Sequence, residues 1–194
     1  SANVFLWAAS AAVILGASLV LYGWALDIEG VKSIIPGLPR IMPNTALGLL
    51  VAAVSIWLMR VEHPQSHLQR LQRRAGQTGA LAVALLGLLT LVEYVSGWDP
   101  GFDQLLFGDP VGTLVSSIPG RLSPHTALSF VLVGFGLLLL DAETRLGLRP
   151  AQIIILTGGL VCLVPLTGYL YSVAGLYGID SYSGMALPTA LSFL

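Results

Sequence analysis

The amino-acid sequence predicts an all-α fold, a polytopic membrane helical bundle made of three related helical hairpins. The first observation is composition: hydrophobic residues make up 55% of the 194 residues and charged residues 10%, with a mean hydropathy of +0.83. A soluble domain would carry about 25% charged residues. The other two observations are a series of long apolar runs and a short motif that recurs three times.

The apolar runs are long enough to serve as membrane crossings, since about 20 residues span roughly 30 Å of hydrocarbon. Five of them lie at 4–26, 44–60, 77–98, 124–140 and 151–177, and a sixth begins near 187. We therefore expect five full crossings and the start of a sixth. A backbone that stops inside lipid leaves carbonyl groups unsatisfied. On that ground residues 1–194 are expected to form a single integral membrane domain that is truncated within its sixth helix.

The recurring motif opens the second, fourth and sixth runs. Its copies are Pro43-Asn44-Thr45-Ala46-Leu47, Pro124-His125-Thr126-Ala127-Leu128 and Leu187-Pro188-Thr189-Ala190-Leu191. Self-similarity of this kind indicates three hairpins built to one plan. Proline is tolerated at the first helical position, and Ser123 or Asn44 can cap exposed donors there. The small threonine and alanine residues would allow close helix contact one turn further in.

Basic residues indicate the orientation. Loops after the second and fourth runs hold six arginines, and the opposite loops hold three basic residues together with most of the acidic ones. The positive-inside rule then places the N-terminus in the cytoplasm. The six are Arg60, Arg70, Arg73, Arg74, Arg145 and Arg149; the three are Lys32, Arg40 and Arg121. Within the first of these loops, residues 64–75 are expected to form a short basic helix at the headgroup boundary.

Three polar residues near the outer membrane face are candidates for ligand binding. Glu93 lies inside an apolar run about one turn from the outer interface, where a carboxyl group is costly unless it is paired, protonated or able to reach water. Asn44 and His125 occupy equivalent positions of the motif, which lipid-facing sites would not favour. Because burying such groups requires partners, we expect the three to contribute to an outward-opening polar cleft that binds a stimulus or small ligand.

Other chemistry is absent from the sequence. It contains no phosphate-binding glycine loop, zinc-spaced Cys/His cluster or nucleophile elbow, so we expect no enzyme activity and no metal site. His63 and His67 have i, i+4 spacing but no third ligand nearby, and Cys162 is expected to be a core residue. No concentrated basic face is present, which excludes nucleic acid as a partner and leaves membrane lipid. The residues identify no cofactor.

Several phrases of the chain resemble a known family. They are Met42 to Leu47, Ser123 to Leu128, Gly168-Tyr169-Leu170-Tyr171 through Gly175-Leu176-Tyr177-Gly178, and Met185-Ala186-Leu187. Together they are similar to the N-terminal six-helix membrane sensor region of bacterial sensor histidine kinases and related signalling proteins. The resemblance implies a sensory input role in the bacterial inner membrane, a homodimer, and a PAS, kinase or cyclase module beyond Leu194. Pro188 departs from the pattern, since Asn or His is expected there, and this weakens the idea of three equivalent polar ligands.

Two other functions compete with the sensor. An accessory subunit of a respiratory or photosynthetic complex would use its apolar faces to bind partner membrane subunits, lipid or pigment. A transporter is the third hypothesis, because Pro165 lies between Gly158-Gly159 and Gly168 and is expected to kink or unwind the fifth run. The sequence lacks the paired broken segments of inverted-repeat transporters. Sequence beyond Leu194 would discriminate the sensor from the subunit.

Overall fold

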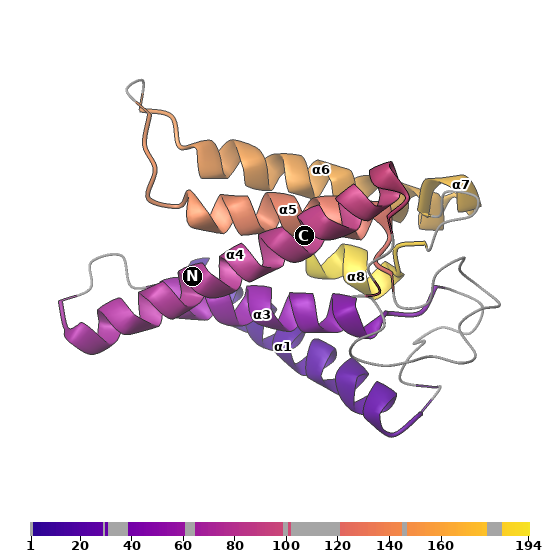
Figure 1. Ribbon diagram of the computed structural model, residues 1–194, viewed down its shortest axis with the longest axis horizontal. Helices are drawn as coiled ribbons and strands as arrows, with labels where there is room; N and C mark the ends of the chain where they lie inside the picture. The colour runs from indigo at the N-terminus through magenta and orange to yellow at the C-terminus, as the bar shows by residue number, and fades with distance from the viewer. Residues whose placement is uncertain are drawn as a thin grey trace.

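A computed structural model describes residues 2–28, 30, 39–60, 65–98, 101, 121–144, 147–177 and 184–194. These residues form helices and turns without any strand, which confirms the all-α prediction (Figure 1). The helices are α1 (Ala2–Ala25), α3 (Pro43–Met59), α4 (His67–Ser96), α5 (Pro124–Leu138), α6 (Pro150–Leu170), α7 (Ala174–Tyr177) and α8 (Leu187–Ser192).

Three helices are long and apolar enough to cross a membrane, namely Leu6–Ala25 of α1, α4 and α6. The other two long helices, α3 and α5, are apolar but have only 17 and 15 residues. At 1.5 Å per residue they measure about 26 and 23 Å, less than the roughly 30 Å of a hydrocarbon core. The helical bundle is therefore confirmed, whereas the length criterion supports three crossings and not the expected five.

The helices that begin with the motif lie inside the bundle. α3 packs against α1 and α4, α5 packs against α4 and α6, and α8 packs against α6. The difference in position is seen in the burial of the residues: 10 of the 17 residues of α3 are buried, but only 5 of the 21 residues of α6. Leu49, Phe130 and Phe193 each stand four residues after the motif threonine, and they meet in one core cluster. The Phe130 and Phe193 rings pack edge to face, with 5.1 Å between the ring centres.

Glycines allow α4 and α5 to pack closely. A Cβ atom added at Gly134 of α5 would lie 2.7 Å from the carbonyl oxygen of Ala80, and one added at Gly87 of α4 would lie 2.9 Å from the backbone nitrogen of Val131. Real Cβ atoms do not approach so closely. The two backbones therefore touch through small residues, as helices in membranes commonly do.

Two helices differ from the sequence prediction in length. Ser66 and Gln69 form a capping box that starts α4 at His67, and the helix runs unbroken for 30 residues. The predicted surface helix at 64–75 is therefore not a separate element, because residues 67–75 form the first turns of α4. The fifth run ends as a helix at Leu170, seven residues early. Pro165 lies within α6, which continues through it without the expected unwound turn.

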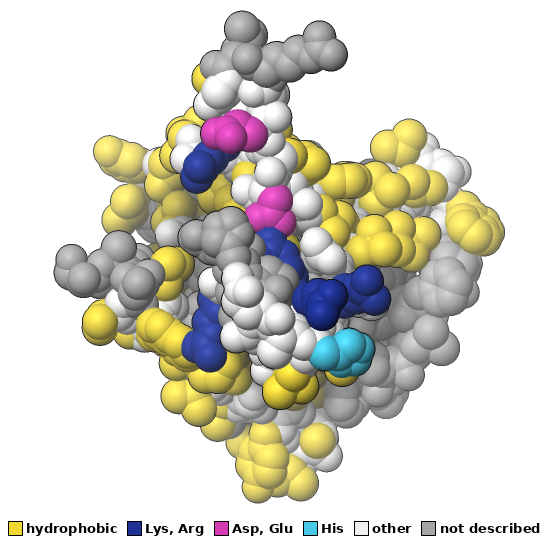
Figure 2. All heavy atoms as spheres, turned by 90° about the vertical axis from the view of Figure 1, so that its left-hand side faces the viewer, with side chains coloured by type: hydrophobic (Ala, Val, Ile, Leu, Met, Phe, Trp, Pro, Cys, Tyr) yellow, Lys and Arg dark blue, Asp and Glu magenta, His cyan; other side chains and the backbone are white. Residues whose placement is uncertain are grey.

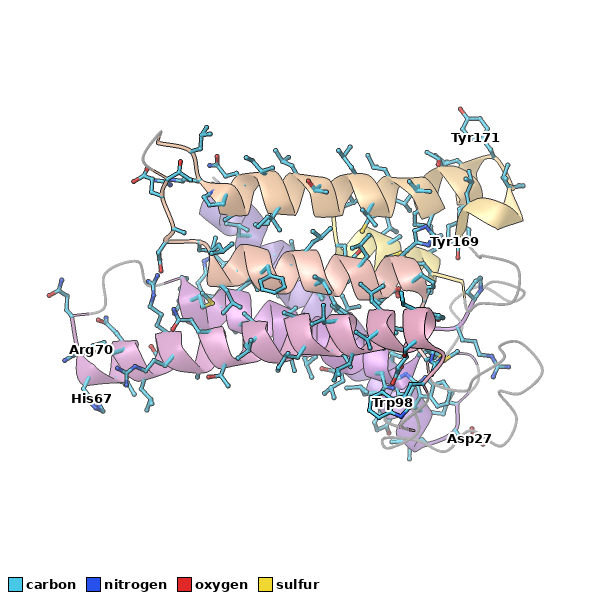
Figure 3. All side chains as sticks on the ribbon, turned by 45° about the horizontal axis from the view of Figure 1, so that its top comes forward. Asp27, His67, Arg70, Trp98, Tyr169 and Tyr171 are labelled. Atoms are coloured by element: carbon cyan, nitrogen blue, oxygen red, sulfur yellow. The ribbon has the colours of Figure 1, made fainter. Side chains whose placement is uncertain are left out.

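The bundle has two distinct ends. At the motif end, α3, α5 and α8 begin; at the arginine end, α3 and α5 finish and α4 begins. Figure 3 shows Asp27, Trp98, Tyr169 and Tyr171 at the motif end and His67 and Arg70 at the other. Basic side chains gather on the arginine end (Figure 2), where the described ones are Arg60, Arg70, Arg73, Arg74 and Arg149.

Several loop residues that the orientation argument counts lie outside the described residues, among them Lys32, Asp103 and Arg145, and so does His63 of the i, i+4 histidine pair. The side of the membrane that each end faces stays a prediction. Aromatic side chains mark the arginine end as well, since Trp7 of α1 meets Trp57 of α3 edge to face at 5.0 Å. The Arg60 guanidinium lies 4.4 Å above the Trp7 ring. Such aromatic residues are typical of a membrane interface.

Candidate functional site

The three hairpins are α1–α3, α4–α5 and α6–α8, and in each of them we call the first helix the outer helix and the second, which begins with the motif, the inner helix. Each hairpin is closed at the motif end by a hydrogen bond of the same kind, which we call the aromatic latch. An aromatic side chain near the end of the outer helix donates to the backbone carbonyl of the residue just before the N-cap of the inner helix. The three latches are Trp24 to Ile41 at 3.0 Å, Tyr94 to Leu122 at 2.7 Å and Tyr169 to Met185 at 2.5 Å.

The latch satisfies a backbone group that would otherwise be costly. Ile41, Leu122 and Met185 are buried, and a buried carbonyl without a donor carries a penalty of about 1–3 kcal/mol. Sequence analysis did not predict these bonds, because each joins residues that are 16 to 28 positions apart. Trp98 and Tyr171, by contrast, are well exposed at the same end, as aromatic residues at a membrane interface would be. The signal that could have found the latch is the constant order of aromatic residue, loop and motif.

The outer helices also end in the same way. The third residue after each latch aromatic has a left-handed backbone conformation. These residues are Asp27 with φ 58°, Gly97 with φ 68° and Ser172 with φ 56°. A left-handed residue is a common helix stop. The repeat therefore extends well beyond the five-residue motif.

The motif residues act as the sequence predicts in helix initiation. α3 and α5 begin at Pro43 and Pro124, and Pro188 is the second residue of α8. Ser123 caps α5, because its hydroxyl accepts a hydrogen bond from the Thr126 N–H at 3.2 Å. The motif threonines and alanines are all buried: Thr45, Ala46, Thr126, Ala127, Thr189 and Ala190. Asn44 does not cap α3, whose N-cap residue is Met42.

The second and third copies differ in how the buried threonine is satisfied. The hydroxyl groups of Ser123 and Thr126 are hydrogen-bonded at 2.7 Å. The position of Ser123 is taken by Ala186 in the third copy, which has no hydroxyl group to offer. Accordingly the Thr189 hydroxyl has no hydrogen-bond partner among the described residues.

Glu93 forms a buried ion pair with Arg121. Arg121 Nε and Glu93 Oε2 are 3.4 Å apart, and only 7% and 4% of the two side chains are exposed. The Arg121 guanidinium also lies 5.5 Å from the centre of the Tyr94 ring. Of the three states that the sequence left open for Glu93, the structure favours the paired one. The sequence analysis did not identify Arg121 as the partner of Glu93, because it considered Arg121 only as a basic loop residue in the orientation argument.

The ion pair joins the last turn of α4 to the residues that lead into α5. The Tyr94 latch makes a second connection at the same point, since its acceptor Leu122 follows Arg121 directly. A charge buried in an apolar bundle is tolerated when an opposite charge compensates it. In this cluster, Glu93, Tyr94, Arg121, Leu122 and Ser123, the ion pair and the latch both join the end of α4 to the start of α5.

The other two predicted site residues also lie at the motif end. Asn44 is buried in the first turn of α3, and His125 is half-buried in the first turn of α5. The His125 backbone carbonyl accepts a hydrogen bond from Ser129 at 2.8 Å. The cleft that would join them to Glu93 stays a prediction.

No group of three or more His, Cys, Asp or Glu side chains is placed to hold a metal ion in the part of the chain that the structure describes. Cys162 is buried and lies 3.2 Å from the Ser129 hydroxyl, as expected of a core residue. No protein-family model, curated protein or solved structure matches this chain.

Proposed function

We propose that the chain is the membrane-embedded sensory input region of a bacterial signalling protein and is not itself catalytic. The observation that carries this proposal is the buried Glu93–Arg121 pair, placed where α4 ends and the chain enters α5. The family resemblance gives the direction of the inference, because its phrases include both residues of the third latch, Tyr169 and Met185, and the residues that start the inner helices.

A buried ion pair contributes little net stability, since its desolvation cost is comparable to its Coulomb energy. Apolar residues of the same size would hold α4 against α5 at least as well. The pair adds the ability to be separated by something that competes for one of its charges. A stimulus that binds Arg121 or protonates Glu93 would loosen the end of α4 from the start of α5.

The geometry of α4 supports transmission of such a change. Its 30 residues form one helix of about 45 Å between the motif end and the arginine end. Helix shifts of about 1–2 Å are a known output of switching proteins. A movement at Glu93 would therefore be carried to Arg73, which forms an ion pair with Asp141 in the connection after α5.

Asn44 and His125 complete the proposed ligand site at the motif end. Their positions at the first turns of α3 and α5 allow contact with a ligand that approaches between the inner helices. In the proposed orientation this end faces away from the cytoplasm, in the inner membrane. Cysteines placed at Gln72 and Gly147 would resist an impermeant thiol reagent in intact cells, and one at Asp103 would react. Labelling of all three from outside would overturn the proposed orientation.

A double variant tests the function. Glu93→Gln with Arg121→Gln keeps two polar side chains but removes both charges, so that no charge is left buried alone. In the source bacterium we expect normal protein levels and the transcript pattern of a strain that lacks the chain. Tyr171→Phe, which alters an exposed tyrosine at the same end, is the matched control and should behave as wild type. A normal response by the double variant would contradict the proposal.

The accessory-subunit hypothesis is favoured by one observation, the apolar outward faces of α1 and α6. Leu15, Leu156 and Leu160 are all well exposed in the isolated chain and would face lipid or partner helices. Native electrophoresis after mild detergent extraction separates the two functions, since a sensor should migrate as a homodimer and a subunit with a much larger complex. A linker and a kinase or cyclase module encoded after Leu194 would support the sensor, whereas an immediate stop codon would support the subunit.

A further inference from the structure

Arginines occupy the outward face of α4 near its start. Residues at spacings of three, four and seven share one helix face, and on α4 this face is exposed along its length. Towards the motif end it is apolar, and towards the arginine end it becomes basic. Its members are Arg70, Arg74, Leu81, Leu85, Leu88 and Val92.

The opposite face of α4 packs against the bundle. Gly76 faces Met59 of α3, and Gly87 faces Ala127 and Val131 of α5. The exposed face therefore points away from the protein, to where lipid would lie. Arg70 and Arg74 stand on that lipid-facing side and do not point into the bundle.

The position of the two arginines along α4 also matches the level in the membrane at which lipid headgroups are expected. Arg74 precedes Val92 by 18 residues, which corresponds to about 27 Å along the helix. That distance is close to the roughly 30 Å thickness of the hydrocarbon core. If Val92 lies near one boundary of the hydrocarbon, Arg74 and Arg70 reach the headgroups of the opposite leaflet.

Two other arginines at this end have acidic partners. Arg73 pairs with Asp141, and Arg149 pairs with Glu143 at 3.6 Å. None of the described residues forms an ion pair with Arg70 or Arg74. Two guanidinium groups one turn apart can share a single phosphate, which arginine recognises through charge-assisted hydrogen bonds.

An occupant of this surface must match both of its parts, the basic turn and the apolar stripe beside it. An acidic peptide would match only the arginines. We propose that Arg70 and Arg74 bind the headgroup of an anionic phospholipid whose acyl chain lies along Leu81 and Leu85. The proposal does not rest on the sensory function proposed above, since none of its observations involves the Glu93–Arg121 pair.

Native mass spectrometry of the detergent-solubilised chain tests the proposal, with dioleoyl phosphatidylglycerol and dioleoyl phosphatidylcholine as probes. We expect the chain to retain phosphatidylglycerol at least fivefold more tightly. Arg70→Gln and Arg74→Gln should each weaken that retention about fivefold, the usual effect of one basic residue at an anionic surface. Arg149→Gln is the matched control, because it removes the same charge from the same end, and should change retention less than twofold.

Four outcomes would overturn the proposal. Equal loss in Arg149→Gln would show diffuse electrostatics in place of a site, and equal retention of phosphatidylcholine would show that charge is not recognised. Displacement of the lipid by an equal concentration of glycerol phosphate would show a free-anion site without an acyl contribution. Undiminished retention in the Arg70→Gln, Arg74→Gln double variant would place the lipid elsewhere. Circular dichroism and the melting temperature of each variant confirm that the bundle is folded.

Discussion

The second and third hairpins share an architecture but differ in their polar content. Both are closed by a tyrosine latch, through Tyr94 and Tyr169 respectively, and both inner helices start at the motif. The residue before the latch tyrosine is Glu93 in the second hairpin and Gly168 in the third. Since the first hairpin also has a glycine there, Gly23, the charged pair is an addition to a common plan and is not needed to build it.

The difference separates architecture from candidate function. Features present in all three hairpins, the latch, the left-handed helix stop and the buried Thr-Ala pair, explain how the bundle forms. The Glu93–Arg121 pair and the cap by Ser123, which among the described residues are seen in the second hairpin alone, require a further reason. That contrast directs experiments to the second hairpin for function and to the third for controls.

The largest effect is expected from breaking the ion pair. Glu93→Leu would remove the carboxylate that faces the buried Arg121 guanidinium and lower the free energy of unfolding by about 3–5 kcal/mol. Adding Arg121→Met should restore most of the loss, since two apolar side chains then fill the same space. Unfolding by sodium dodecyl sulfate in mixed micelles measures both variants. An unchanged stability in Glu93→Leu would mean that the carboxylate does not compensate the arginine.

Part of this organisation could be predicted from sequence. The inner helices were expected to start at 44 and 124 and do start at Pro43 and Pro124, because proline and a serine cap are strong local signals. The apolar run predicts a start at 77, whereas α4 starts ten residues earlier at His67. The first turns of α4 are polar, so they do not belong to the apolar run. The latches and the Glu93–Arg121 pair join residues 16 to 28 positions apart. The repeated order of aromatic residue, loop and motif is a signal for the latches, whereas the ion pair occurs in one hairpin and has no repeated pattern to reveal it.

The second and third hairpins should also differ in their tolerance of a methyl group added between packed helices. Gly134→Ala would place a methyl group against the Ala80 carbonyl of α4 and should cost about 1–3 kcal/mol through overpacking. Gly158→Ala in α6 is the control, because its added Cβ would lie at an ordinary contact distance of 3.5 Å from Leu132. It should gain up to about 1 kcal/mol from helix propensity. Losses of equal size would show that α6 packs as closely as α4.

The latches should behave alike if they belong to the common plan. Tyr94→Phe and Tyr169→Phe each remove the hydroxyl donor and leave a buried carbonyl, so each should lower the free energy of unfolding by about 1–2 kcal/mol. Tyr171→Phe, which changes an exposed tyrosine, should have almost no effect. A much larger loss at Tyr94 would indicate that its contact with Arg121 matters more than the latch itself. The same unfolding assay compares the three variants.

The smallest expected effect lies at the helix stops, where the two hairpins should respond in opposite directions. Gly97 and Ser172 hold the same left-handed conformation, with φ of 68° and 56°. A residue with a Cβ atom pays about 1–2 kcal/mol there, whereas glycine does not. Gly97→Ala should therefore destabilise the bundle by about 1 kcal/mol and Ser172→Gly should stabilise it by somewhat less, because glycine also gains entropy in the unfolded chain. If Ser172→Gly destabilised the protein, the serine side chain would have to make a contact that outweighs the strain of its backbone.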